Sequence, residues 1–240
     1  MFVDEFYTEK DGRWIIRADQ ASRFAKEVAE DFNPIHDPDS RRFCVPGDLL
    51  FALVLGRIGL YQQMSFSFST MVGNEVPLVL DSAQEGLFRI RDEMGKECLD
   101  VRFSGNATND PEIVENFTRQ YVAFSGRNFP HYLHPLFEEH GVMFHPQRPL
   151  VIYDRMDFDF TSVALKGTGL VFDGASMDVE RRRAVVILKF KFTDETKTVG
   201  YGSKKMIVSG LRPYDATVMN GVVEEFCRLK DSYERPASLS

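Results

Sequence analysis

The feature that most constrains the fold is an apolar run at residues 48–64, DLLFALVLGRIGLYQQM. Its first half would be apolar on nearly every face of a helix, whereas a surface helix carries a single apolar stripe. The run meets Arg57 well before it could span a bilayer. It therefore predicts a helix enclosed by other structure. Gly56 and Gly59 form helices poorly, and close approach of a neighbouring backbone would account for them.

Patterns around this run predict a first cycle of helix and antiparallel strands. Residues 3–17 are typical of a hairpin with its turn at KDG. Asp19 is expected to cap an amphipathic helix that ends near Asp31, because the residue before Pro34 is biased out of the helical region. The strands expected after the enclosed helix are 65–72, 86–91 and 98–105.

A second cycle begins at Asp110, which is expected to cap a helix with Pro111 in its first position. A last helix is expected from Asp215, with its apolar side facing inward: Met219, Val222, Val223, Phe226 and Leu229. The strands expected between these helices are 156–163, 167–179, 184–192 and 200–210. Helix followed by antiparallel strands, twice over, predicts an α+β fold.

The two cycles divide the chain into halves at residues 1–107 and 108–232, with 233–240 expected as a flexible tail. No residue-level repeat or long linker separates the halves, so they are expected to share a sheet or pack tightly. The formal charge of −7 argues against a nucleic-acid partner and against an anionic membrane. Three widely spaced cysteines and an acidic N-terminus without signal-peptide character predict a soluble, cytoplasmic protein.

An acid, a bend and a histidine stand just before the enclosed helix. Asp31 and His36 flank Asn33 and Pro34 in the segment DFNPIH, and Gly47 follows in VPGDLL. This order resembles the MaoC-like, (R)-specific enoyl-CoA hydratase family, whose loop reads Asp-x-Asn-Pro-[Ile/Leu]-His before a glycine turn and a central helix. The resemblance covers roughly the first 105 residues. It implies a hot-dog fold, and the repeated layout implies a double hot-dog whose second half lacks the catalytic loop.

The resemblance implies hydration of a trans-2-enoyl thioester, carried by CoA or an acyl carrier protein, to an (R)-3-hydroxyacyl thioester. Neutral His36 could take a proton from water, while Asp31 holds the same water and donates a proton or fixes the imidazole. Gly47 lies where a helix begins, so its N–H could stabilise charge on the thioester oxygen. Asn33 and Pro34 would shape the bend. No cofactor or metal is implied, and homodimerisation is left open.

Two departures from the family pattern bear on activity. The segment from His36 to Gly47, HDPDSRRFCVPG, is shorter than in the family. Asp48 stands where the family often has Met, and its charge would oppose an enolate unless it points away as a helix-capping group. These departures favour an alternative, an inactive hot-dog module that binds acyl thioesters or a protein partner. A third interpretation is a structural or interaction protein with its charged residues 37–42 at the interface.

Each candidate residue also has a plain structural interpretation. Asp31 could end its helix, Asn-Pro often begins a turn, and a lone loop histidine is usually solvated. Arg41 and Arg42 could bind a CoA phosphate, although solvated loop arginines are common. Cys44 is interpreted as a buried structural thiol. Four clustered histidines lack the helical spacing of a zinc site and are interpreted as surface or interface residues: His131, His134, His140 and His145.

Overall fold

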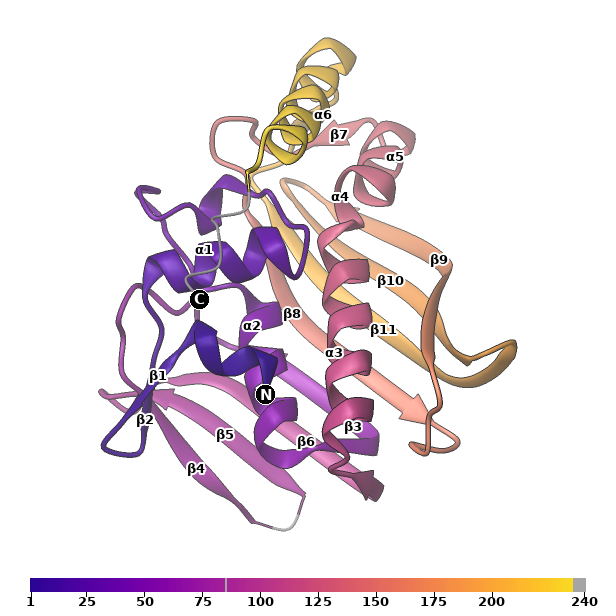
Figure 1. The fold of residues 1–240 in the computed structure, drawn as a ribbon. Helices are drawn as coiled ribbons and strands as arrows, with labels where there is room; N and C mark the ends of the chain where they lie inside the picture. The colour runs from indigo at the N-terminus through magenta and orange to yellow at the C-terminus, as the bar shows by residue number, and fades with distance from the viewer. Residues whose placement is uncertain (85, 235–240) are drawn as a thin grey trace.

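The computed structural model describes residues 1–84 and 86–234, and its main feature is one antiparallel sheet of ten strands. The strands lie side by side in the order β1-β2-β4-β5-β6-β3-β8-β11-β10-β9 (Figure 1). Their bounds are β1 Thr8–Lys10, β2 Arg13–Ile15, β3 Leu60–Phe68, β4 Leu78–Gln84, β5 Leu87–Asp92, β6 Glu97–Thr108, β8 Val151–Phe160, β9 Thr168–Glu180, β10 Arg183–Asp194 and β11 Lys197–Ser209. A separate pair joins β7 Val142–Met143 to β12 Arg212–Pro213.

Helices α2, Gly47–Ile58, and α3, Pro111–Gly126, lie together against one face of this sheet (Figure 1). The remaining helices are α1 Ala18–Glu27, α4 Asn128–His131, α5 Leu133–Glu139 and α6 Ala216–Asp231. Phe51 of α2 packs against Tyr121 of α3 and Phe158 of β8, with ring centroids 4.8 and 5.8 Å apart. Every residue of α2 from Asp48 to Leu55 is buried, which confirms the prediction of an enclosed helix.

The arrangement is a hot-dog fold of the α+β class, as predicted. The first unit wraps β3 to β6 around α2, and the second curves β8 to β11 past α3 (Figure 1). The units share the sheet through β3 and β8, whose register pairs Met64 with Phe158. The chain crosses between them at the end of β6, and Asp110 then caps α3 by accepting from the N–H of Glu112, as expected.

The enclosed helix is shorter than predicted, because it ends at Ile58 and not at Met64. Gly59 adopts φ +84°, a left-handed conformation that only glycine enters freely. A side chain there would also meet the carbonyl of Thr108 at 2.6 Å. Leu60 therefore starts β3, so the strand expected from residue 65 begins five residues earlier.

Several other boundaries differ from the predictions. Residues Phe2–Phe6 form a 3₁₀ helix, which shortens the expected 3–17 hairpin to β1 and β2. Arg17, not Asp19, is the N-cap of α1, which ends at Glu27. Strand β4 and helices α4 and α5 were not predicted, since their sequences carry no clear periodicity. None of the described helices is long and apolar enough to cross a membrane.

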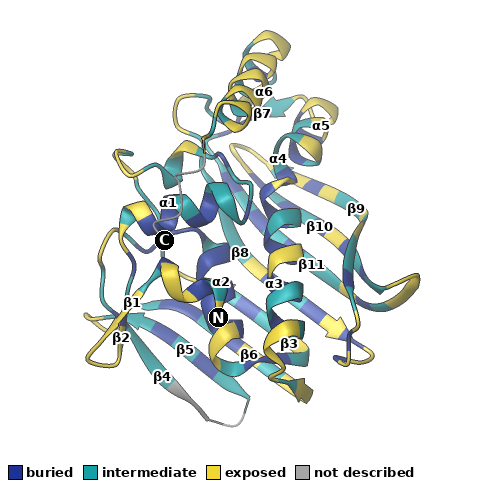
Figure 2. Ribbon diagram, in the orientation of Figure 1, coloured by how far each residue is buried: buried dark blue, intermediate teal, exposed yellow. Residues whose placement is uncertain are grey.

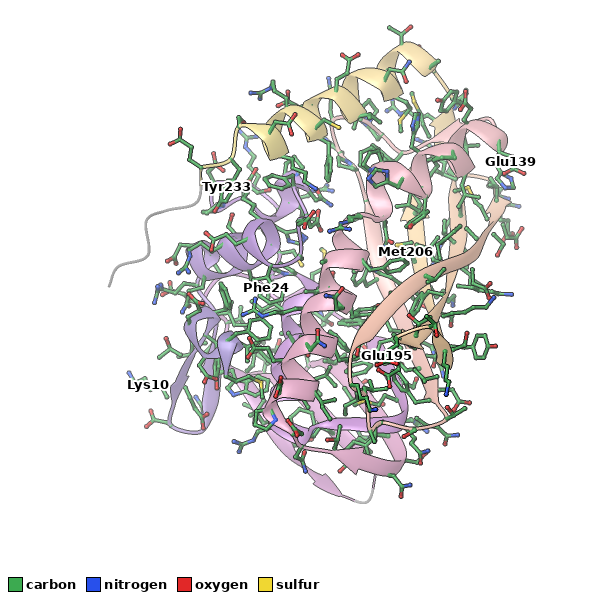
Figure 3. The ribbon with its side chains drawn as sticks, turned by 45° about the vertical axis from the view of Figure 1, so that its right-hand side comes forward. Lys10, Phe24, Glu139, Glu195, Met206 and Tyr233 are labelled. Atoms are coloured by element: carbon green, nitrogen blue, oxygen red, sulfur yellow. The ribbon has the colours of Figure 1, made fainter. Side chains whose placement is uncertain are left out.

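Asp215 is the N-cap of helix α6, where the helix was predicted to start, and its side chain accepts from Val218 N–H at 3.1 Å. Its expected inner side is only half covered: Met219 is buried, whereas Phe226 and Leu229 are partly exposed. Figure 2 shows the largely exposed outer face of this helix. Beyond it, Tyr233 packs on Phe32 with ring centroids 5.7 Å apart. Figure 3 labels Tyr233 just past the end of α6. Of the expected tail, residues 235–240 lie outside the described residues.

Candidate active site

A cavity of about 860 Å³ lies where the two units meet. The first unit contributes the loop before α2 and the start of α2 itself. The second unit contributes the end of α3, parts of α4 and β8, and one side of α6. Its lining includes Asp31, His36, Gly47, Asp48, Ser125, Asn128 and Tyr153. Both halves of the chain therefore contribute residues to the cavity.

Local hydrogen bonds bend the loop that carries the first two of these residues. Asp31 Oδ1 accepts from the N–H of Asn33 at 2.9 Å, and Asn33 Oδ1 accepts from the N–H of Ile35 at 3.2 Å. Pro34 then starts a short 3₁₀ helix, Pro34–His36. The bend expected from Asn33 and Pro34 is present, and it brings the ends of the segment together.

Asp31 and His36 face each other in the cavity. His36 Nδ1 lies 2.7 Å from the carbonyl oxygen of Cys44, and since a carbonyl can only accept, Nδ1 carries the hydrogen. The other ring nitrogen, Nε2, lies 3.6 Å from Asp31 Oδ2. This separation suits an ion pair but exceeds a hydrogen bond. Both side chains keep some access, with 12% of the His36 side chain and 21% of the Asp31 side chain exposed.

The pair is held towards its charged form. Burial would raise the pKa of Asp31, but the His36 ring and the N–H of Asn33 outweigh burial and lower that pKa below its ordinary 3.8. Burial would lower the pKa of His36, but Asp31 and the Cys44 carbonyl outweigh it and raise that pKa above 6.5. Both shifts are in the direction that favours the charged form of each group, a carboxylate on Asp31 and an imidazolium on His36.

Gly47 is the first residue of α2 and lines the same cavity. The first N–H groups of a helix have no partner within it and lie at the positive end of its dipole. A Cβ at this position would come within 3.0 Å of the Tyr153 ring and 3.2 Å of the Phe68 ring. Glycine therefore lets two aromatic rings close against the start of the helix.

Asp48 does not cap the helix, so the helix-capping alternative raised for it does not apply. The N-cap is Pro46, and the Asp48 side chain turns into the protein, leaving 3% of the residue exposed. Its Oδ2 accepts a hydrogen bond of 2.6 Å from Ser125 and one of 3.1 Å from the Tyr153 hydroxyl. Burial raises the pKa of Asp48, while the nearby Lys204 acts against that shift.

Lys204 completes this cluster from β11. Sequence reasoning missed it, as it missed Ser125, Asn128 and Tyr153. Only 1% of Lys204 is exposed, and its Nζ donates to Ser125 Oγ at 2.5 Å. The ammonium also lies 3.3 Å from the centroid of the Tyr153 ring. Burial lowers the pKa of Lys204 to about 8, although Asp48 and Asp31 oppose that shift. The alternation along β11 could have identified it, because residues two apart in a strand share a face and Lys204 lies on the inward face with Met206 and Val208.

Other candidates from the sequence lie elsewhere or have no chemical role. Arg41 and Arg42 are exposed and do not line the cavity, whereas Lys96 does. Burial raises the pKa of Cys44 to about 11, which suits a structural thiol. Within the described ranges, no group of three or more potential ligands is arranged to hold a metal ion. The sequence spacing of four histidines predicts that they are surface or interface residues and do not bind a metal, and this stays a prediction: His131, His134, His140 and His145.

Fold and cavity together define a double hot-dog protein with an acid/histidine pair just before its enclosed helix. Comparison with known proteins gives the family. Residues 1–217 match the family described as "Protein of unknown function (DUF3581)", so the chain belongs to that family. The comparison with curated proteins found no match.

Solved structures of similar layout include a MaoC-like dehydratase, at 10% identity and a TM-score of 0.43, covering 85% of this chain and 98% of its own. An acyl-CoA thioesterase II from Mycobacterium marinum matches at 10% identity and 0.44, covering 89% and 99%. A conserved hot-dog protein of unknown function from Alicyclobacillus acidocaldarius matches at 8% identity and 0.47, again covering 89% and 99%. Similarity at this level bears on neither substrate nor reaction.

Proposed function

We propose that this protein is a hydratase or dehydratase of acyl thioesters, which adds water to a trans-2-enoyl thioester to give an (R)-3-hydroxyacyl thioester. The observation that carries the proposal is the Asp31–His36 pair, 3.6 Å apart and facing one cavity with Gly47. General acid/base chemistry needs two groups of opposite protonation state within reach of one substrate. The family likeness of the loop supports the same reaction.

The directions of the two pKa shifts suggest a role for each group in this reaction. The Asp31 carboxylate takes a proton from a water molecule, whose oxygen bonds to C3 of the enoyl group. The His36 imidazolium gives its Nε2 proton to C2, and the C2=C3 double bond becomes a single bond. A proton passing from Asp31 to His36 then restores the pair. These roles reverse those expected from the sequence, because the sequence alone gave His36 its ordinary pKa near neutrality.

The thioester oxygen gains negative charge as the double bond is attacked. An N–H at the start of α2, beside Gly47, would stabilise that charge without having to reorganise. Losing one such donor typically costs about 3 kcal/mol of barrier. Lys204 supports this role indirectly, because its charge within the buried cluster offsets the Asp48 carboxylate at the same helix end.

The cavity suits an acyl chain. Its wall includes apolar side chains from the second unit and from the inner side of α6: Phe129, Leu133, Phe144, Met206, Val222 and Phe226. A volume of about 860 Å³ lies within the range of sites for small organic ligands. CoA and an acyl carrier protein both present such a chain as a thioester, and both fit the proposal. Homodimerisation stays an open question, and the absence of a nucleic-acid partner stays a prediction.

A second candidate is an acyl-thioester-binding module without turnover. The observation that favours it is Asp48, because a carboxylate close to the start of α2 opposes enolate charge. The two candidates differ in product formation and not in binding.

The test incubates the purified protein with trans-2-enoyl-CoA substrates of short, medium and long chain, and with an enoyl-acyl carrier protein. Loss of the conjugated enoyl thioester and appearance of the 3-hydroxyacyl product are followed, together with release of free thiol. Hydrated product supports the proposal. Binding with no product supports the inactive module, and free thiol in place of hydrated product would replace the proposed reaction with thioester hydrolysis.

A further inference from the structure

Helix α6 presents one continuous side to the cavity. Six of its residues line the cavity at the three- and four-residue spacing that defines one face of a helix: Val218, Gly221, Val222, Glu225, Phe226 and Leu229. Met219 is the one residue of this helix that is buried in the protein. The cavity-facing side of α6 is therefore within reach of a ligand along most of the length of the helix.

One end of this side lies beside the loop that carries Asp31. The ring of Phe226 packs edge-on against the ring of Phe32, the residue after Asp31, with centroids 6.1 Å apart. One turn further on, Lys230 Nζ pairs with Glu30 Oε2 at 2.7 Å. Both contacts join the last turns of α6 to the segment that leads into the acid/histidine loop. A thioester bound at that loop would therefore meet α6 near Phe226.

The other end of α6 belongs to the second unit. Val218 and Val222 pack against the apolar core formed largely by α5, β10 and β11. In Figure 3 the helix runs from near Tyr233 towards Glu139, at the end of α5. A ligand chain that starts at the loop before α2 and follows α6 therefore passes Phe226 before it reaches Val222.

Gly221 lies on the cavity-facing side with open space around it. Among the described residues, an added Cβ would meet nothing within 4 Å. The backbone at Gly221 is helical and lacks the positive φ that calls for glycine. Glycine is also one of the poorest helix formers. Neither backbone conformation nor close packing therefore accounts for a glycine at this position.

The missing side chain widens the cavity at one place along α6. Gly221 lies five residues from Phe226, which corresponds to about 7.5 Å along the helix axis. Val218 and Val222, on either side of this space, are apolar. Glu225, the charged residue among the six that line the cavity, is paired with Arg228 at 2.6 Å. The space beside Gly221 thus has an apolar border and suits the far end of a hydrocarbon chain.

We propose that Gly221 sets the length of the acyl chain that the cavity accepts, by leaving open the space beside Val218 and Val222 for the end of a long chain. This inference rests on the proposed function and names long-chain acyl thioesters as its substrate class. Each methylene group that reaches the apolar wall adds to affinity, because it leaves water. A short chain gains nothing from this space, since it ends nearer to Phe226.

The experiment measures binding of saturated acyl-CoA ligands by calorimetry, so that no turnover intervenes. The series is butyryl-, octanoyl-, dodecanoyl- and hexadecanoyl-CoA, and wild-type affinity is expected to rise along it. Gly221→Leu should weaken binding of hexadecanoyl-CoA at least about ten-fold, the effect of excluding roughly two methylene groups from apolar contact. Butyryl-CoA should bind the variant and the wild type alike. An equal loss for every chain length, or no loss at all, overturns the inference.

Further variants locate the effect at the cavity. Gly221→Ala adds only a methyl group and should weaken hexadecanoyl-CoA binding less than Gly221→Leu does, whereas Gly221→Phe should exclude dodecanoyl-CoA as well. Asn220→Leu is the matched control, because Asn220 is the preceding residue of α6, is exposed and does not line the cavity. It should leave the chain-length profile unchanged. A profile that Asn220→Leu alters as much as Gly221→Leu overturns the inference.

Stability provides a readout that separates chain-length selection from a structural role. Because a side chain at 221 has space and leucine forms helices better than glycine, Gly221→Leu should leave the unfolding midpoint unchanged or raise it. A large fall in the midpoint would mean that the position is tightly packed and would contradict the inference. If no acyl-CoA of the series binds, the proposed function fails as well. If the wild type hydrates short and long enoyl-CoA and Gly221→Leu does so equally, only the inference fails.

Discussion

Ser125 donates a hydrogen bond of 2.6 Å to Asp48, although the two residues are 77 positions apart in the chain. Asp48 lies in the first turn of α2 and Ser125 in the last turn of α3. The bond ties the enclosed helix of the first unit to the helix of the second. The geometry of the candidate active site therefore depends on how the two units dock, and changes at this junction should affect stability and activity together.

The proposed catalytic role of the Asp31–His36 pair can be tested by removing either charge. Asp31→Asn and His36→Asn should each lower the rate of enoyl-CoA hydration by at least about 10²-fold, the usual contribution of a general acid or base. Matched controls are Asp39→Asn and His140→Asn, both at exposed positions. They should keep the wild-type rate in the same assay. Activity retained in both Asp31 and His36 variants would remove the pair from the mechanism.

The pH profile tests which group is the acid. The proposed mechanism needs an ionised Asp31 and a protonated His36. The pKa of Asp31 is lowered from its ordinary 3.8 and that of His36 is raised from its ordinary 6.5. The rate should be highest between these two pKa values and fall as pH rises through the pKa of His36. Initial rates over pH 5 to 9 would measure this fall, with both values treated as properties of the coupled pair. A rate that increases over this range would instead assign neutral His36 as the base.

Removing Lys204 should destabilise the fold. Lys204→Met leaves the Asp48 carboxylate buried without the charge that offsets it, and breaking a buried pair in this way typically costs about 3–5 kcal/mol. Lys205→Met is the matched control. Lys205 pairs with Asp154 at 2.8 Å on the surface, where such pairs contribute about 1 kcal/mol or less. Urea unfolding of both variants measures the difference, and equal losses would mean that the buried charge is not structural.

The depressed pKa of Lys204 should also affect how stability depends on pH. Its pKa is about 8 in the folded protein against an ordinary 10.5, so between these values the unfolded state binds more protons. The contribution of Lys204 to the free energy of unfolding therefore rises with pH from about 8 towards 10.5. Subtracting the pH profile of Lys204→Met from that of the wild type isolates this contribution. A flat difference would show that Lys204 titrates normally.

Gly126 should be intolerant of a side chain. A Cβ would overlap the Ala29 carbonyl oxygen and come within 3.0 Å of the Asp31 amide nitrogen. Gly126→Ala should therefore cost about 1–3 kcal/mol or more through overpacking and should slow hydration by moving Asp31. In contrast, Gly221→Ala in α6 has open space around its Cβ and should be neutral or stabilise by up to about 1 kcal/mol. Thermal unfolding and turnover of the two variants provide the comparison.

Local features of the chain were predictable because nearby residues decide them. The bend at Asn33 and Pro34 follows from side-chain bonds that span only two residues. Asp110 and Asp215 cap their helices through equally local bonds. Local patterns failed at Gly59. The apolar pattern continues past this residue, but α2 ends there because the Gly59 backbone is left-handed and lies against Thr108 of another strand.

The sequence by itself determined an enclosed helix, alternating strands on either side of it and an acid/histidine loop at its start. These depend on hydrophobic periodicity and short-range hydrogen bonds, which can be recognised one segment at a time. Only the tertiary structure decided that Asp48 turns inward, that Lys204 is buried beside it and that the two halves form one cavity. Burial and charge pairing depend on which distant segments come into contact, and those contacts cannot be recognised from one segment of the sequence at a time.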